Sequence, residues 1–323
     1  MFDRLRHLIA NNQILIVLLA LVLGILFPSF FLPLAAFSTP MLMAIFFTSS
    51  LRLELNELWS YAKDWKMLSS ANIVKLFVIP LLMWIPLHYF APDWALAFLI
   101  VGVVPTGLTI ALIADLFGGK TSLAMLISAT TSLLAPLTVP FVFWLLLRQQ
   151  IAIPVVSLFE SLFLTIVVPF LVAMLIKAKA KKTIQKYDLW WREISLVLFG
   201  LLVAGITADS VKGATITLGW NELGIIIVML IFMGGAAWLA YAIAAWRKPS
   251  ERVTIALCMV YMNNTLALYI GDQFFHGQNV VPKLLIILTA VNALLIPIKW
   301  AATKALAKER KMGKKPREAQ AVF

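Results

Sequence analysis

Residues 95–117 form an apolar run that is long enough to cross a lipid bilayer, but Pro105 and Gly107 interrupt it near its middle. Proline has no backbone N–H and its ring collides with the carbonyl one turn back, while glycine adds conformational freedom. A membrane helix broken here exposes backbone groups that lipid cannot satisfy. Such a break is tolerated where it is buried in protein or lines a watery cavity. The run therefore indicates either a proline-kinked structural helix or part of a binding site.

A second apolar run, residues 255–270, is interrupted by the polar sequence MNNT at 262–265. The segments that follow the two breaks are similar: residues 109–117 read TIALIADLF and residues 265–274 read TLALYIGDQF, with one inserted residue. Interrupted hydrophobic segments at corresponding places in two halves of a chain indicate the binding site of a secondary transporter. We therefore favour the binding-site interpretation for both breaks.

The composition is that of a protein with its core in lipid. Hydrophobic residues fill 62% of the 323 positions and charged residues only 13%, far from the mix of a soluble domain. The single cysteine, Cys258, excludes an intrachain disulfide framework. Three histidines and one cysteine offer no ligand cluster for a catalytic metal, and there is no glycine-rich phosphate loop. We therefore expect neither an enzyme nor an ATP-driven pump, and we predict no cofactor.

Polar and turn-forming positions divide the chain into ten apolar segments, each near the length that a hydrocarbon core of ~30 Å requires. We predict ten transmembrane helices at about residues 12–29, 33–50, 67–89, 95–117, 121–147, 153–177, 193–208, 221–246, 252–271 and 282–304. The two breaks fall in the fourth and the ninth of these helices.

Breaks in the fourth and ninth of ten helices divide the chain into two sets of five. Because five is odd, the second set must enter the membrane upside down relative to the first. We therefore expect an all-α membrane protein made of two inverted five-helix repeats, with broken helices 4 and 9 crossing near the midplane. The predicted repeats are residues 1–149 and 150–309, followed by a basic cytoplasmic tail at 310–323.

The basic residues predict the orientation. With the N-terminus in the cytoplasm, only three of the 27 lysines and arginines fall on the outer side of the membrane: Arg148, Lys212 and Lys283. Cytoplasmic loops carry such an excess. The net charge of +12 is therefore a topology signal and does not predict nucleic-acid binding. We expect a monomer in the bacterial inner (plasma) membrane, in contact with membrane lipids and with both termini in the cytoplasm.

Lys75 is the outstanding ionisable residue at membrane depth. It lies about nine residues into the third predicted helix, roughly 13 Å from the inner end. A lysine side chain can snorkel over only part of that distance, and a charge left there costs about 2.5–3.5 kcal/mol. We therefore expect Lys75 to face either a partner or a water-filled vestibule open to the cytoplasm.

Neutral side-chain oxygen atoms surround the two breaks. They belong to Thr106, Thr109, Ser128, Thr130, Thr131, Asn263, Asn264 and Thr265. Serine and threonine often bond back to their own helix, so Asn263 and Asn264 are the better candidates for a site. Asp115 and Asp272 close the two second half-helices near opposite membrane faces, which argues against a shared catalytic pair.

Short motifs relate the chain to a known family. They read VPTG at 104–107, FGGKTSLA at 117–124, TSLLAPL at 131–137 and MNNT at 262–265. Together with the ten predicted helices, these motifs resemble the bile acid:sodium symporter family, which belongs to the bile acid/arsenite/riboflavin transporter superfamily. The resemblance covers nearly the whole length of the chain. The resemblance implies a panel and a core of helices that move an organic anion by alternating access. The candidate substrate- or ion-binding residues that it implies are Lys75, Pro105, Thr106, Gly107, Thr109, Ser128, Met259, Met262, Asn263, Asn264 and Thr265.

The resemblance also implies that most sodium ligands of the family are missing. Ile110-Ala111 stand where the family has a Ser-Asn pair, and Met259 stands where it has a glutamate. Asn263 and Lys75 each stand where the family has a glutamine. Sodium binding is therefore doubtful, and the chain is a divergent member on this interpretation.

We expect Lys75 to replace the lost cation. Its ammonium would bond unwound carbonyls near Val104 and Met262 and the side chain of Asn263. Burial disfavours the charged form of an amine, so Lys75 is also a candidate proton carrier.

The predicted function is secondary active transport of a small organic anion, bile-acid-like, steroid or small carboxylate, that is sodium-independent or proton-coupled. Two alternatives remain. One is an arsenite-type permease, which the resemblance implies would use a thiolate in the fourth helix, whereas Cys258 lies in the ninth. The other is a membrane receptor that has kept the fold without transport.

Overall fold

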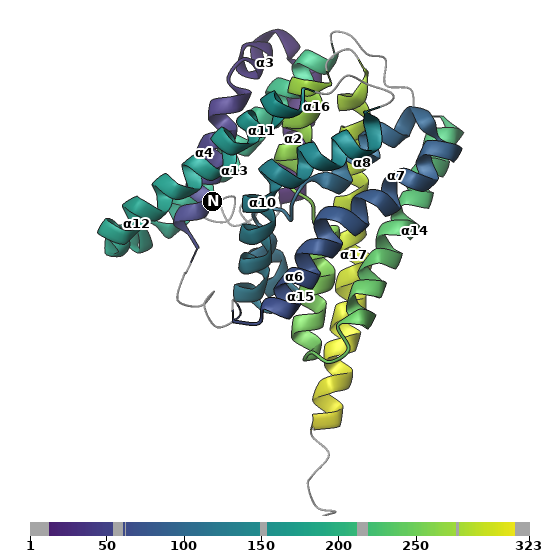
Figure 1. The fold of residues 1–323 in the computed structure, drawn as a ribbon. Helices are drawn as coiled ribbons and strands as arrows, with labels where there is room; N and C mark the ends of the chain where they lie inside the picture. Colours follow the sequence, from purple (N-terminus) through teal and green to yellow (C-terminus); the bar gives the residue numbers. More distant parts are fainter. Residues whose placement is uncertain are drawn as a thin grey trace, which may run out of the picture.

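The structure is a computed structural model, in which residues 13–53, 61, 63–148, 154–211, 219–275 and 278–313 are described. Within these residues the regular secondary structure is helical, with one isolated antiparallel bridge (Figure 1). The all-α prediction is therefore confirmed for the described residues. The predicted boundary between the two repeats, at 149 and 150, and residues 314–323 of the predicted tail lie outside them.

Six stretches among the described residues are long and apolar enough to cross a membrane. They are Trp65–Phe90, Thr121–Leu147, Val155–Lys186, Asp188–Ser210, Glu222–Ile243 and Val280–Ala307. A seventh candidate is the pair α3 (Pro28–Ala35) and α4 (Ser38–Leu51), which is bent by 72°. These helices confirm that the protein crosses a membrane several times.

Shorter helices occupy the remaining predicted segments. α2 (Gln13–Leu26) lies in the first, α8 (Pro92–Val103) and α9 (Ile110–Leu116) share the fourth, and α15 (Pro249–Val260) and α16 (Asn264–Phe274) share the ninth. None of these five helices alone reaches the roughly 20 residues that span a bilayer. α8 and α15 are instead buried by neighbouring helices over most of their length, which is where a membrane protein tolerates an interrupted helix.

Two of the long stretches contain a π-helical segment. The first stretch consists of α6 (Trp65–Ile73), η1 (Val74–Val78) and α7 (Ile79–Phe90), and η1 carries Lys75. The other consists of α11 (Val155–Leu162), η2 (Phe163–Val167) and α12 (Val168–Lys186). Each segment ends just before a proline, Pro80 or Pro169, whose missing N–H and bulky ring prevent the ordinary hydrogen bond to the preceding turn.

The ends of two further helices differ from the prediction. α13 (Asp188–Val211) begins earlier than the predicted residue 193, and Asp188 in its first turn complements the positive end of the helix dipole. α17 (Val280–Gly313) extends beyond the predicted residue 304, so residues 310–313 of the predicted tail belong to this helix.

The helices form two groups. In the group that we call the panel, α13 packs against α2, α3 and α4, and α12 packs against α4. In the group that we call the core, α8 packs against α7 and α17, α10 (Thr121–Leu147) packs against α9 and α15, and α14 (Trp220–Ile243) packs against α15 and α17. We assign α11 and η2 to the panel because they continue directly into α12 and because η2 packs against α4. We assign α6 and η1 to the core because they continue into α7, and α16 because it follows α15. The two groups meet where α16 contacts α4 and α13, and where α10 contacts α11 and η2.

Candidate functional site

The two predicted breaks lie against each other in the core. α8 ends at Val103, and the chain is unwound until α9 begins at Ile110. α15 ends at Val260, and α16 begins only at Asn264. Both interruptions predicted from the sequence are therefore confirmed.

The unwound segments satisfy each other's backbone groups. The N–H of Gly107 donates to the carbonyl of Tyr261 at 2.9 Å, and the N–H of Asn263 donates to the carbonyl of Pro105 at 2.9 Å. The two bonds form an antiparallel bridge between Thr106 and Met262, which we call the crossing. Pairing of this kind replaces hydrogen bonds that lipid cannot supply.

Gly107 is the residue that permits this close approach. A Cβ atom at this position would lie 2.6 Å from the ring of Tyr261 and 2.8 Å from the carbonyl oxygen of Met262. Both distances are shorter than any normal van der Waals contact, so a side chain at residue 107 would push the crossing apart.

Hydroxyl groups of α10 hold the first break in place. The hydroxyl of Ser128 lies 3.2 and 3.3 Å from the carbonyl oxygens of Thr106 and Gly107, to which it donates. The hydroxyl of Thr131 accepts the N–H of Thr106 at 3.3 Å. Thr106 in turn donates its own hydroxyl to the carbonyl of Cys258 at 2.9 Å. In this conformation the predicted site residues Thr106 and Ser128 therefore bind backbone.

Asn263 caps the second half of the ninth predicted helix. Its side-chain oxygen accepts the N–H of Leu266 at 3.1 Å, which is the usual role of asparagine at a helix N-terminus. Its side-chain nitrogen is buried and has no hydrogen-bond partner among the described residues. Asn264 begins α16, and Thr265 is buried beside it. Asn263 thus retains a free donor at the crossing.

Lys75 is fully buried and reaches the crossing from η1. Its ammonium contacts the sulfur of Met262. We expected bonds to unwound carbonyls and to Asn263; the partner instead is a thioether, and the Asn263 oxygen is already bonded to Leu266. A vestibule open to the cytoplasm is also excluded for this conformation, because no part of Lys75 is exposed.

Met259 faces a cavity that none of the other predicted site residues lines. It is buried and lines an apolar cavity of about 110 Å³ between the α6–η1–α7 stretch and α14. It therefore brings no charge or oxygen atom to the crossing.

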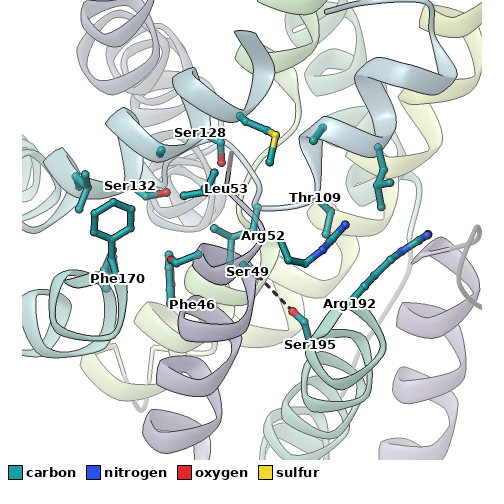
Figure 2. Close-up of a pocket in the computed structure, with 18 of the residues that line it drawn as sticks. Phe46, Ser49, Arg52, Leu53, Thr109, Ser128, Ser132, Phe170, Arg192 and Ser195 are labelled. Atoms are coloured by element: carbon teal, nitrogen blue, oxygen red, sulfur yellow. Dashed lines mark hydrogen bonds between the residues drawn. The ribbon is translucent and has the colours of Figure 1, made fainter. Parts of the chain in front are cut away.

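A cavity of about 60 Å³ lies between panel and core, beside the first break (Figure 2). Figure 2 shows Arg52 and Arg192 on one side of it, and Ser128, Ser132 and Phe170 on the other. The Ser132 hydroxyl is buried without a hydrogen-bond partner among the described residues. The volume is enough for a few water molecules. The cavity thus combines two cationic groups with hydroxyl donors.

The panel supplies the arginines. Arg52 follows α4 and forms an ion pair of 2.9 Å with Asp188 at the start of α13, and Arg192 lies one turn further along α13. Ser49 and Ser195 of the same two helices lie 3.4 Å apart, hydroxyl to hydroxyl. In the sequence, both arginines serve only to predict the orientation in the membrane. The one further indication of a role in the site is that each lies next to the end of a predicted helix.

A second cavity of about 40 Å³ continues the first toward the crossing. The two share the lining residues Leu108, Thr109, Ser195 and Leu196. The Thr109 hydroxyl lies 2.7 Å from the hydroxyl of Tyr261, a residue that the sequence analysis did not single out. The second cavity is further lined by the predicted residues Gly107, Met262, Asn263, Asn264 and Thr265. Lys75 and Pro105 line neither cavity.

The fold and the site define a multi-pass helical membrane protein in which two interrupted helices cross beside a cavity that is lined by two arginines. A sequence model of the Sodium Bile acid symporter family matches residues 39–215. Because the match covers more than half of the chain, the chain belongs to this family.

Individual relatives agree with this assignment. The sodium/bile acid cotransporter 7 of Xenopus tropicalis is 25% identical over 245 residues, which cover 72% of this chain and 71% of the relative. The protein of the same name from Rattus norvegicus is 24% identical over 245 residues, with 72% of each chain covered. An uncharacterized sodium-dependent transporter of Bacillus subtilis (strain 168), YocS, is 24% identical over 269 residues, which cover 81% of this chain and 82% of the relative.

Membership of this family confirms three predictions. The resemblance inferred from the short motifs is correct. The protein belongs to a family of transporters and is not an enzyme. A transporter of this kind has a small molecule as its substrate.

Proposed function

We propose that the protein is a secondary active transporter that moves a small organic anion across the membrane by alternating access. The observation that carries this proposal is the antiparallel crossing of the two breaks beside a cavity lined by Arg52 and Arg192. Crossing, interrupted helices are the usual position of a substrate site in secondary transporters. In this mechanism the panel and the core move relative to each other and expose the cavity to one side at a time.

The proposed topology is ten helices in two inverted five-helix repeats, residues 1–149 and 150–309. The antiparallel direction of the unwound segments supports an inverted relation between them. We place the protein as a monomer in a bacterial inner membrane with both termini in the cytoplasm. The arginine-lined end of the cavity then faces the cytoplasm.

The chemistry of the cavity favours an anion. A guanidinium group binds carboxylates and similar anions through paired, charge-assisted hydrogen bonds. Asp188 offsets part of the charge of both arginines and Glu193 part of that of Arg192, but two guanidinium groups border the cavity. Apolar side chains such as Phe46 and Phe170 share the lining, so a steroid acid and a small carboxylate both remain within the proposed class.

We further propose that transport does not require bound sodium, because Lys75 occupies the place of the cation at the crossing. A buried ammonium repels a second cation nearby. The ammonium of Lys75 contacts the thioether of Met262 and lies near the thiol of Cys258, and neither group is a carboxylate. The names of the relatives connect those proteins with sodium. The resemblance implies that this chain departs from the sodium ligands of the family at Lys75, Ile110, Ala111, Met259 and Asn263.

A ligand screen followed by a flux measurement tests the transport proposal. Purified protein is screened with organic acids for a rise in melting temperature, since a ligand that binds the folded state stabilises it. Each stabilising acid is then offered as a radiolabelled substrate to proteoliposomes. We expect at least one acid both to stabilise the protein and to enter the vesicles. Stabilisation without any flux would instead identify a receptor.

A further inference from the structure

Tyr269 of α16 joins the core to two helices of the panel. Its side chain is buried, and its hydroxyl lies 3.1 Å from the hydroxyl of Thr39 on α4. The same hydroxyl lies 2.7 Å from the hydroxyl of Ser161 on α11. One phenol of the core therefore holds two panel helices at once.

A second contact reinforces the same end of the interface. Gln273 lies about one turn beyond Tyr269 on α16, and its side-chain nitrogen lies 3.3 Å from the hydroxyl of Ser38 on α4, to which it donates. The same nitrogen also donates to the Asp272 carboxylate at 2.8 Å. Core and panel are thus joined by a patch of partly buried polar contacts, which we call the latch.

The latch lies at the end of α4 that is far from the arginines of the cavity. Thr39 is in the first turn of α4, whereas Ser49 and Arg52, which line the cavity, lie at the other end. Thirteen residues of helix separate Thr39 from Arg52, which is roughly 20 Å. Figure 1 shows α3, α11 and α16 together at one end of the molecule, in agreement with this separation.

We propose that Tyr269 is a positioning residue for transport: its hydroxyl holds core and panel together on the far side, so that the cavity is open only at its arginine end. This inference rests on the proposed function in one respect, the relative movement of the two groups. When they move, Tyr269 must exchange the Thr39 and Ser161 hydroxyls for water, and the far side opens.

Removal of the hydroxyl should therefore shift the balance between the two conformations without unfolding the protein. In Tyr269→Phe the ring keeps its packing, and the released Thr39 and Ser161 hydroxyls can bond to carbonyls of their own helices. A net hydrogen bond of ordinary strength corresponds to a change of about two- to tenfold in the conformational equilibrium.

Thiol labelling measures that equilibrium directly and needs no substrate. Cys258 is fully buried, and its backbone carbonyl accepts the hydrogen bond from Thr106, so Cys258→Ala provides a thiol-free background. Ser49→Cys then places a reporter in the cavity. A membrane-impermeant maleimide is added from either side of oriented vesicles, and the two labelling rates are compared.

We expect Tyr269→Phe to raise labelling from the far side by about two- to tenfold. The pair Thr39→Val and Ser161→Ala should produce the same shift and add little to Tyr269→Phe. The matched control is Tyr89→Phe, because Tyr89 is exposed at the end of α7. An unchanged ratio of the two rates in a Tyr269→Phe protein that keeps its melting temperature would overturn the inference, as would an equal shift in Tyr89→Phe.

The labelling experiment and the flux measurement can fail separately. If Tyr269→Phe changes the ratio of the two labelling rates but the protein moves no organic acid, the latch is supported and the transport proposal is contradicted. Flux that is accompanied by no shift would contradict the latch alone.

Discussion

The ammonium of Lys75 lies against the sulfur of Met262, at the point where the chain passes from α15 to α16. A thioether is a weak acceptor and carries no charge, so this contact does little to offset the cost of burying an amine. A group retained at such a cost inside a membrane protein is a candidate for function.

Replacement of Lys75 should reduce transport without reducing stability. Lys75→Met removes a buried charge and keeps much of the shape, so we expect a melting temperature equal to or above that of the parent. Uptake should fall by about tenfold or more, because the crossing loses its fixed cation. Lys75→Gln should also abolish or uncouple transport. Lys66→Met, at an exposed position on the same helical stretch, should change neither quantity. A Lys75 variant as active and as pH-sensitive as the parent would count against this role.

Gly107→Ala tests the close approach at the crossing. The new Cβ atom would meet the Tyr261 ring at 2.6 Å, and we expect the free energy of unfolding to fall by about 1–3 kcal/mol. Gly234→Ala is the matched control, because a Cβ atom there meets no atom within 4 Å and alanine favours the helix. Denaturation in detergent compares the two variants. Equal stability of both would show that the crossing tolerates a side chain.

Arg192→Gln tests the proposed anion site. Loss of a charge-assisted hydrogen bond should weaken binding of a stabilising organic acid by about ten- to a hundredfold, measured as its Kd by calorimetry. Arg148→Gln serves as the control, because Arg148 follows α10 and stacks on Trp144 rather than lining the cavity. If both variants bind the acid as the parent does, the cavity beside Arg192 is not the anion site.

Alkaline pH should reveal the contact between Tyr61 and Glu251. Burial, followed by the charge of Glu251 and the hydrogen bond to it, raises the pKa of Tyr61 above its ordinary value. The folded chain then keeps the phenol proton at a pH where the unfolded chain loses it, so this stabilisation is present below about pH 10 and disappears as the pH rises. We expect the melting temperature to fall above this pH, and to fall less in Tyr61→Phe. Tyr187→Phe is the control, and an identical fall in all three proteins would contradict the prediction.

The positions of the breaks could be predicted from local sequence alone. Pro105 and Gly107 disrupt the first helix through their backbone chemistry, and the polar residues 262–265 interrupt the second apolar run. The depth of Lys75 within an apolar run predicted either a buried partner or a water-filled vestibule, and the structure shows the buried contact. Its actual partner could not be predicted, because the contact with Met262 depends on the π-helical turn of η1 and on packing between distant helices. The same limit applies to Ser128, whose hydroxyl could be placed near the break but not on its carbonyls.

The cavity arginines show a different limit. In the sequence Arg52 and Arg192 flank apolar segments as many other basic residues do, and only the packing of α4 against α13 brings them to one cavity. Tyr269 lies inside an apolar run, where nothing marks its hydroxyl as the link between α4, α11 and α16.

Uptake without sodium tests the central claim most directly. Proteoliposomes that contain the parent protein, in sodium-free buffer with an imposed pH gradient, are given an organic acid that stabilises the purified protein. With Lys75 in place of the lost cation, we predict that the acid accumulates at the same initial rate whether or not sodium is then added. Uptake that occurs only after sodium is added would contradict the account.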